Sequence, residues 1–337
     1  MNMEKWKKEI LASPVKKAIP VLSFPSIQLI GISVKQLIED SALQAEGMRL
    51  IAERTDSWAS LGMMDLSVEA EAFGSKIRIT DDEVPTVIGR IIENENDADK
   101  LLIPDVSKGR AGLYVKAIEK AIAGIRDRPV FGGIIGPFSL AGRLMEMSEI
   151  MINCYDEPDM VHKTLEKASE FITNYILEFK KAGANGIVMA EPAAGLLSPL
   201  LAEEFSSGYV KKIIEKTKDD SFLFVYHNCG PNTVLMLQSL VEMGADAYHF
   251  GNAVKMKQVL DGMPDDVLVM GNISPPEQFC NGTPESVYYA ATELLRECSG
   301  YRNFIISSGC DIPPASPWAN IDSFFKAVKD YNGPSGT

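Results

Sequence analysis

One histidine and two cysteines stand where apolar runs of this sequence end. His227 and Cys229 lie together in the segment Tyr226-His227-Asn228-Cys229-Gly230, and Cys310 lies far downstream in Ser307-Ser308-Gly309-Cys310-Asp311. Imidazole nitrogen and thiolate sulfur are preferred zinc ligands, and three such ligands leave a fourth coordination position free, as in catalytic zinc sites. The residue types therefore point to an enzyme that activates a substrate on a metal ion.

The spacing supports a shared site. Side chains alternate along an extended chain, so the two residues of a His-x-Cys pair face the same side and can bind one ion. Glycine follows Cys229 and precedes Cys310, which relieves crowding of the backbone near a ligand. The alternative stays open, because a buried free cysteine is often a small hydrophobic residue and a single histidine is often a satisfied core residue. We assign that structural role to the remaining cysteines, Cys154, Cys280 and Cys298.

Short β-branched or aromatic runs that alternate with segments of helical period must position these residues. Such alternation predicts repeated β-α units around a parallel sheet. Eight runs favour a (β/α)8 TIM barrel, although a doubly wound sheet would give the same alternation. The runs are Pro20 to Phe24, Asp56 to Gly62, Pro129 to Gly136, Gly186 to Glu191, Ser221 to His227, Ala245 to Gly251, Val267 to Asn272 and Asn303 to Gly309.

We expect an α/β chain with a single barrel domain over residues 1–337, in which an N-terminal helical and hairpin extension and insertion occupy about 1–127. The insertion would contain a hairpin and then a helix from about Gly109. Outside it, helices are predicted over Glu157 to Ala182 and over Pro284 to Cys298, the second capped by Thr283. The tail from Gly333 should be frayed. The predicted hairpin strands are Phe73 to Ile79 and Thr86 to Ile92.

Polar residues gather at the carboxyl ends of the predicted strands, where barrel enzymes carry their chemistry. Glu191 could accept a proton from a thiol or orient a ligand, or it could be a solvated carboxylate at a strand end. Asp311 could hydrogen-bond to the metal ligands or stabilise its own turn. The direction of His249 depends on the register of its strand, and a core or surface role is favoured for it.

The composition excludes several classes of partner. The chain carries a formal charge of −13, whereas proteins that bind nucleic acid collect positive charge. No arginine occurs between Arg143 and Arg296, so no guanidinium near the metal candidates is available to bind carboxylates or phosphates. We find no signal peptide and no membrane span. An odd number of cysteines, 5 in all, fits reduced thiols, and we expect a cytoplasmic protein.

Several further motifs carry a resemblance to a known family. They are Gly136-Pro137-Phe138, Ala182-Gly183-Ala184, Glu191-Pro192-Ala193, Leu197-Ser198-Pro199, Gly271-Asn272-Ile273-Ser274-Pro275 and Gly309-Cys310-Asp311-Ile312-Pro313. With His227-Asn228-Cys229-Gly230 they extend over nearly the whole chain. The sequence resembles the uroporphyrinogen decarboxylase superfamily and, within it, the zinc-dependent corrinoid methyltransferases. The His-x-Cys pair with a distant cysteine is the specific part of this resemblance.

The resemblance implies a zinc ion held by His227, Cys229 and Cys310, with a thiol substrate in the fourth position. The methyl group would come from a methylcobamide carried by a partner corrinoid protein. These three residues and Glu191 would be catalytic. Coenzyme M, a homocysteine-like thiol and tetrahydrofolate remain open as acceptors, and a homodimer remains open as the assembly. The residues that would contact substrate are Gly136, Pro137, Phe138, Asn252, Asn272 and Ser274.

Two departures from the family pattern bear on the alternatives. The decarboxylases carry arginines near the N-terminus, but the matching stretch Pro20 to Ser26 has none. A metal-free decarboxylase-like lyase would also leave the three candidate ligands without a role. Asn252 stands where related methyltransferases place a carboxylate close to the zinc. This amide is the one hint of a third interpretation, a barrel that binds a corrinoid or another ligand without turnover.

Overall fold

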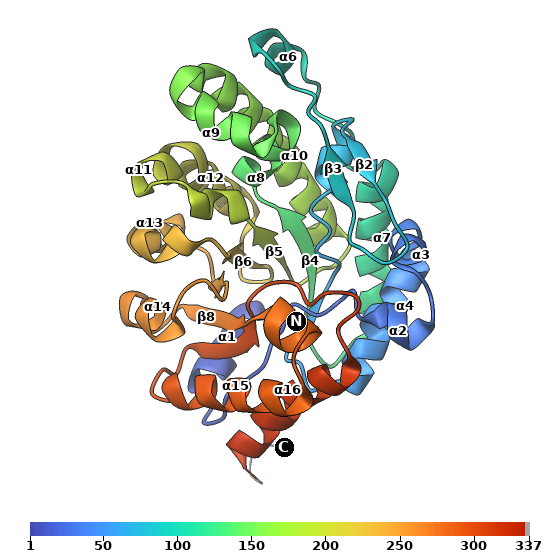
Figure 1. Ribbon diagram of the computed structural model, residues 1–337, viewed down its shortest axis with the longest axis vertical. Coiled ribbons are helices and arrows are strands. Elements are labelled where there is room, and N and C mark those ends of the chain that lie inside the picture. The colour runs from blue at the N-terminus through green and yellow to red at the C-terminus, as the bar shows by residue number, and fades with distance from the viewer. Residues whose placement is uncertain (334–337) are drawn as a thin grey trace.

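The computed structural model describes residues 1–333 and shows a parallel sheet surrounded by helices (Figure 1). Seven strands form this sheet in the order β1-β4-β5-β6-β7-β8-β9, and every neighbouring pair is parallel. The predicted α/β barrel class is confirmed. The strands lie within seven of the eight predicted runs or extend them by one residue: β1 Ser60–Leu61, β4 Val130–Ile135, β5 Gly186–Ala190, β6 Leu223–Asn228, β7 Ala247–Phe250, β8 Leu268–Ile273 and β9 Phe304–Ser308.

The first predicted strand, Pro20 to Phe24, is wrong in position and extent. The chain there makes one isolated parallel bridge, between Ala18 and Ile306 of β9. The carbonyl of Ala18 also accepts from Trp58 N, close to β1, at 3.0 Å, so this segment links the two edges of the sheet. Pro20 explains why no longer strand forms, because proline has no N–H to continue a ladder.

Side chains of the sheet divide into two buried groups. Alternate strand residues form an interior core that includes Val188 and Ala190 of β5 and Leu223 and Val225 of β6. The residues between them, such as Ile187 and Phe224, pack in the larger core that contains the helices. This alternation follows from the period of two in a strand. It decides which strand-end residues reach the barrel interior.

Helices that follow the strands cover the outside of the sheet. The predicted helix over Glu157 to Ala182 is α10, Pro158–Lys181. The predicted helix from Pro284 is α15, Pro284–Glu297, and Thr283 forms a capping box with Ser286. The other helices of this layer are α7 Gly109–Gly124, α8 Pro137–Met145, α9 Met147–Asp156, α12 Gly208–Thr217, α13 Leu237–Met243, α14 Met256–Gly262 and α16 Trp318–Asn332.

The part of the chain before β4 contains the hairpin and helices that were predicted there. The hairpin pairs β2 with β3 in antiparallel register, within the two runs predicted for it, and α7 begins at Gly109 as expected. Helix α1, Met3–Ala12, contributes Met3, Trp6 and Ile10 to the interior core. The elements before α7 are α1, α2 Ser26–Ile30, α3 Val34–Glu39, α4 Ser41–Arg54, β1, α5 Val68–Ala72, β2 Lys76–Arg78, β3 Thr86–Ile88 and α6 Glu95–Lys100.

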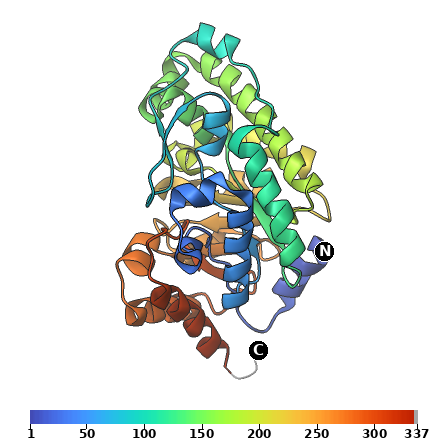
Figure 2. The same ribbon diagram turned by 90° about the vertical axis from the view of Figure 1, so that its right-hand side faces the viewer.

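Short helical turns occupy several loops at the carboxyl ends of the strands. They are η1 Pro192–Leu196, α11 Pro199–Ala202, η2 Glu203–Ser207, η3 Pro231–Met236 and η4 Pro275–Cys280. The two ends of the described chain both lie in the lower half of the view in Figure 2. Of the tail predicted to fray from Gly333, residues 334–337 lie outside the described residues. Across 1–333, no helix combines the length and the apolar character needed to cross a lipid bilayer.

Candidate metal centre

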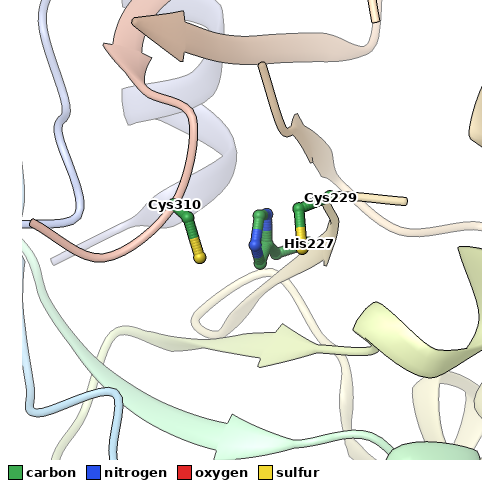
Figure 3. Close-up of side chains that lie close together, drawn as sticks. All are labelled: His227, Cys229 and Cys310. Atoms are coloured by element: carbon green, nitrogen blue, oxygen red, sulfur yellow. The ribbon is translucent and has the colours of Figure 1, made fainter. Parts of the chain in front are cut away.

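His227, Cys229 and Cys310 converge at the carboxyl ends of β6 and β9 (Figure 3). One ligand atom from each residue lies within 4.8 Å of the other two. In a tetrahedral zinc site with ordinary Zn–S and Zn–N bonds, ligand atoms lie roughly 3.5–3.8 Å apart. The three side chains are therefore close to the spacing at which one metal ion could bridge them.

Strand β6 brings the first two of these residues to the same side. Leu223 and Val225 face the interior core, and the alternation of the strand carries His227 and Cys229 to that side as well. His227 is buried, while Cys229 and Cys310 are partly exposed. The candidate site thus combines a buried imidazole with two cysteines that are partly exposed.

The two nitrogens of the His227 ring have different environments. Nδ1 lies 3.2 Å from the carbonyl oxygen of His249 and 2.6 Å from Nδ1 of His249. Nε2 is buried and has no hydrogen-bond partner among the described residues. Buried polar atoms are paired in the great majority of cases, so an unpaired one requires an explanation. Coordination of a metal ion by Nε2, with Nδ1 held by a carbonyl or another acceptor, is the usual arrangement of a histidine ligand.

The two thiols form a coupled pair. The hydrogen bond between them lowers the pKa of Cys229 to about 7, and burial opposes this shift. The same hydrogen bond, together with burial, raises the pKa of Cys310 to about 12. A single proton shared between two sulfurs accounts for both directions. A divalent cation would displace that proton, since coordination deprotonates a thiol.

Glycines let the loops approach the ligands closely. A Cβ atom on Gly251 would lie 2.5 Å from Cα of Cys229, and a Cβ on Gly195 would lie 2.6 Å from Cα of Gly230. A side chain larger than hydrogen at either position would push the segment that carries Cys229 out of place. The loops after β5, β6 and β7 are therefore packed closely against each other around Cys229.

Glu191, which was predicted to be catalytic, is not part of this cluster of possible metal ligands. It follows Ala190, which faces the interior, so its side chain turns to the helix layer, where it is fully buried. Its oxygens accept from the backbone N–H groups of Phe138, at 3.0 Å, and Ser139, at 2.6 Å. Burial raises the pKa of this carboxyl to about 7. Glu191 thus caps helix α8, for which Gly136 offers no side-chain cap.

The predicted substrate residues of the Gly-Pro-Phe turn form the start of helix α8, which Glu191 caps. Gly136 precedes helix α8, Pro137 begins it, and Phe138 is fully buried. A Cβ on Gly136 would lie 2.4 Å from Oε2 of Glu191. The glycine is needed here because the carboxylate reaches the helix N-terminus through the space that a side chain would fill.

Of the other three predicted substrate residues, Asn272 and Ser274 make hydrogen bonds to loops after β7 and β8, and Asn252 lies on the loop after β7. Asn272 donates to the carbonyl oxygens of Gly251 at 2.8 Å and Val254 at 2.7 Å. Ser274 accepts from the backbone N–H of Glu277. Asn252 is exposed, and its backbone N lies 2.7 Å from the position that a Cβ on Gly309 would take. Asn252 therefore borders the loop that carries Cys310.

The sequence favoured a core or surface role for His249 and did not single out Ser307, but both lie behind the metal candidates. His249 is in register with His227 on the neighbouring strand and is buried. Its Nε2 lies 2.8 Å from Oγ of Ser307 on β9. Burial lowers the pKa of His249 well below its ordinary value. The register of β6 with β7 was the missing information, because it determines that both imidazoles face the interior.

Asp311, next to Cys310, was expected either to assist the ligands or to stabilise its turn. One of its carboxylate oxygens, Oδ1, is buried without a hydrogen-bond partner among the described residues. Burial raises the pKa of this carboxyl well above its ordinary value.

Comparisons with known proteins identify the family of this chain. The family model described as uroporphyrinogen decarboxylase (URO-D) matches residues 13–331. The chain belongs to the uroporphyrinogen decarboxylase family. It is 30% identical over 271 residues to the methylcobamide:CoM methyltransferase of Methanosarcina acetivorans, a match that covers 79% of this chain and 78% of that protein. The predicted family and its methyltransferase branch are confirmed.

The chain is also similar to a decarboxylase and to a solved methyltransferase structure. A uroporphyrinogen decarboxylase of Neisseria meningitidis is 29% identical over 227 residues, which cover 64% of this chain and 62% of that enzyme. The solved structure of a methyltransferase from Methanosarcina mazei superposes with a TM-score of 0.86 at 21% identity, over 97% of this chain and 98% of that one. This superposition shows that the two chains share their fold.

Proposed function

We propose that this protein is a zinc-dependent methyltransferase that moves a methyl group from a protein-bound methylcobamide to a thiol such as coenzyme M. The observation that carries the proposal is the cluster of two cysteine sulfurs and one ring nitrogen of His227 within 4.8 Å of one another at the carboxyl ends of the strands. A relative with 30% identity over most of its length is named for methyl transfer between these two compounds.

The residues of the site suit this chemistry. Nε2 of His227 and the sulfurs of Cys229 and Cys310 would hold the zinc. When bound, Zn²⁺ lowers the pKa of a thiol enough to provide the thiolate at neutral pH. Two cysteine thiolates balance the charge of the metal ion, so the acceptor sulfur keeps its electron density. The partial exposure of both cysteines leaves the acceptor and the methyl donor a path to the site.

In the proposed reaction the methyl–cobalt bond of the corrinoid breaks and a methyl–sulfur bond forms on the acceptor. The electron pair of the methyl–cobalt bond stays with cobalt, which passes from Co(III) to Co(I). The products are a methyl thioether, the reduced corrinoid and the proton that the acceptor thiol loses to solvent. The partner would be the protein that carries the corrinoid. We propose the cytoplasm as the compartment, because the ligand thiols must stay reduced.

Decarboxylation by the same barrel is the second candidate, favoured by the 29% identity to a decarboxylase. Two observations weigh against it. The segment Pro20 to Ser26 offers no arginine for substrate carboxylates. The buried Nε2 of His227 would also remain without a partner in a metal-free enzyme.

Elemental analysis tests the metal. Wild-type protein purified without chelators should contain about one zinc per chain, the stoichiometry of a single three-residue site, and Cys229→Ala should contain none. Cys280→Ala is the matched control, because Cys280 is also partly exposed but does not belong to the cluster. If folded wild-type protein fails to take up zinc even on reconstitution, the proposed mechanism is wrong.

Methyl transfer is measured separately. Methylcobalamin would be the donor and a panel of thiols the acceptors. The absorbance of the corrinoid would report the reduction of cobalt. The zinc-loaded wild type should convert at least one thiol to its methyl thioether. A zinc-loaded protein that converts none would favour a binding protein without turnover.

A further inference from the structure

A chain of three buried polar side chains continues from the metal candidates into the barrel. His227 on β6, His249 on β7 and Ser307 on β9 are 3%, 1% and 0% exposed. Nδ1 of His227 lies 2.6 Å from Nδ1 of His249, and Nε2 of His249 lies 2.8 Å from Oγ of Ser307. Below them, the same strands contribute only apolar side chains to the interior core.

The short contact between the two Nδ1 atoms restricts the protons. One of these nitrogens must donate and the other accept, because two N–H groups would repel and two lone pairs would form no bond. The chain therefore has two self-consistent arrangements. Each fixes all four ring nitrogens at once.

In the first arrangement Nδ1–H of His227 donates to His249, and Nε2–H of His249 donates to the oxygen of Ser307. Nε2 of His227 is then a free lone pair near the two sulfurs. In the second arrangement every proton is reversed, so Nε2 of His227 carries a hydrogen. Nδ1 of His227 would then be a lone pair that faces the carbonyl oxygen of His249 at 3.2 Å. Because a carbonyl oxygen only accepts hydrogen bonds, this arrangement is the less favourable one.

We infer that His249, oriented by Ser307, is a positioning residue that holds His227 in the Nδ1–H tautomer with Nε2 available for the metal. This inference rests on the proposed function for the purpose of the tautomer, although the tautomer itself does not depend on zinc. His249 touches no reacting atom. Its effect is transmitted through the orientation of one ligand ring.

The backbone provides a partial substitute. Nδ1 of His227 also lies 3.2 Å from the carbonyl oxygen of His249, so replacement of the side chain leaves one weaker acceptor. Loss of such an outer hydrogen bond reduces metal affinity by about 10–100-fold in metal sites generally. We expect a reduction in that range and not a complete loss of binding.

A matched pair of variants separates the hydrogen bond from the packing. In His249→Asn the amide oxygen can accept from Nδ1 of His227, whereas His249→Leu has a similar branched shape and no acceptor. Zinc affinity, measured by competition with a chromophoric chelator, should fall about 10–100-fold in His249→Leu. It should stay close to the wild-type value in His249→Asn. The visible spectrum of Co²⁺-loaded protein should change in the leucine variant alone.

Nitrogen NMR of the metal-free wild type tests the tautomer without any variant and without activity. We expect the chemical shift of a protonated nitrogen at Nδ1 of His227 and that of a free lone pair at Nε2. The opposite assignment would overturn the inference, as would equal zinc affinities in His249→Leu and wild type. If the wild type shows the expected tautomer but binds no zinc, the proposed function fails while the tautomer assignment stands.

Discussion

Two buried polar residues on adjacent strands show how differently this fold uses polarity. His227 lies near the carboxyl end of β6 on the inside of the barrel, and Glu191 follows β5 on the outside. The backbone N–H of Glu191 donates to the carbonyl oxygen of His227 at 2.8 Å. Both oxygens of Glu191 accept from backbone N–H groups of α8. Nε2 of His227 has no partner among the described residues. Burial is common to both, but only the histidine keeps a free bonding position.

The difference teaches which buried polar groups deserve a functional interpretation. The first N–H groups of a helix have no partner within that helix, and α8 uses the carboxylate of Glu191 to satisfy two of them. A residue whose hydrogen bonds are all directed to its own scaffold stabilises the fold. A residue with an unsatisfied atom that faces two thiols is prepared to bind something else.

The largest expected effect comes from removal of a ligand inside the barrel. Cys310→Ala should abolish zinc binding and lower methyl transfer by more than about 100-fold, the upper range for loss of even an outer metal contact. The free energy of unfolding of the metal-free protein should change by only about 1 kcal/mol, because Cys310 is partly exposed. Zinc content, activity and denaturant unfolding check this. Full activity in the variant would show that zinc bound here is not required.

Removal of the Glu191 carboxylate, outside the barrel, should lower folding stability and leave zinc binding unchanged. Glu191→Ala leaves the N–H groups of Phe138 and Ser139 unpaired and creates a cavity, so we expect a loss of about 3–5 kcal/mol of folding stability. Urea unfolding measures the loss. Zinc stoichiometry of the folded fraction should remain at the wild-type value. A folded variant without zinc would place Glu191 among the residues that support the metal.

A second buried carboxylate on the helix side of the sheet, Glu69, should make the folding stability depend on pH. Glu69 accepts from Ile135 N at 2.9 Å, and burial raises its pKa from 4.5 to about 7. Since the folded state binds its proton more tightly, the stabilisation is complete below pH 4.5 and is lost as the pH rises through 7. This shift corresponds to about 3 kcal/mol at most. Glu69→Gln should lack this decline, and parallel slopes for the two proteins would contradict the prediction.

The smallest effect should come from a cap remote from the metal candidates. Thr283 caps α15 through the backbone N–H of Ser286. Thr283→Ala should cost about 1 kcal/mol of folding stability, the usual value for an N-cap. Thermal unfolding measures this, while zinc affinity should stay unchanged. A change in zinc affinity would show that general loss of stability reaches the metal centre, and the effects of Glu191→Ala would then need the same correction.

Local patterns in the sequence were sufficient for most of the framework. Seven of the eight predicted runs contain strands, since β-branched and aromatic runs of this length favour extended chain. Thr283 and Pro284 marked the start of α15 because cap and first-turn preferences act over a few residues. The first predicted run, which begins at Pro20, does not form a strand. Its pairing depends on which backbone groups of β9 lie opposite it, and the composition of the run does not determine this.

The candidate metal ligands could be selected from the sequence, because residue chemistry and the alternation of an extended chain already place His227 and Cys229 on one side. The approach of Cys310, the pairing of His249 with His227 and the turn of Glu191 toward α8 were decided by the tertiary structure alone. Each depends on the register between strands or on the position of a helix N-terminus in space. These are relations between distant segments, and a single sequence read along the chain does not contain them.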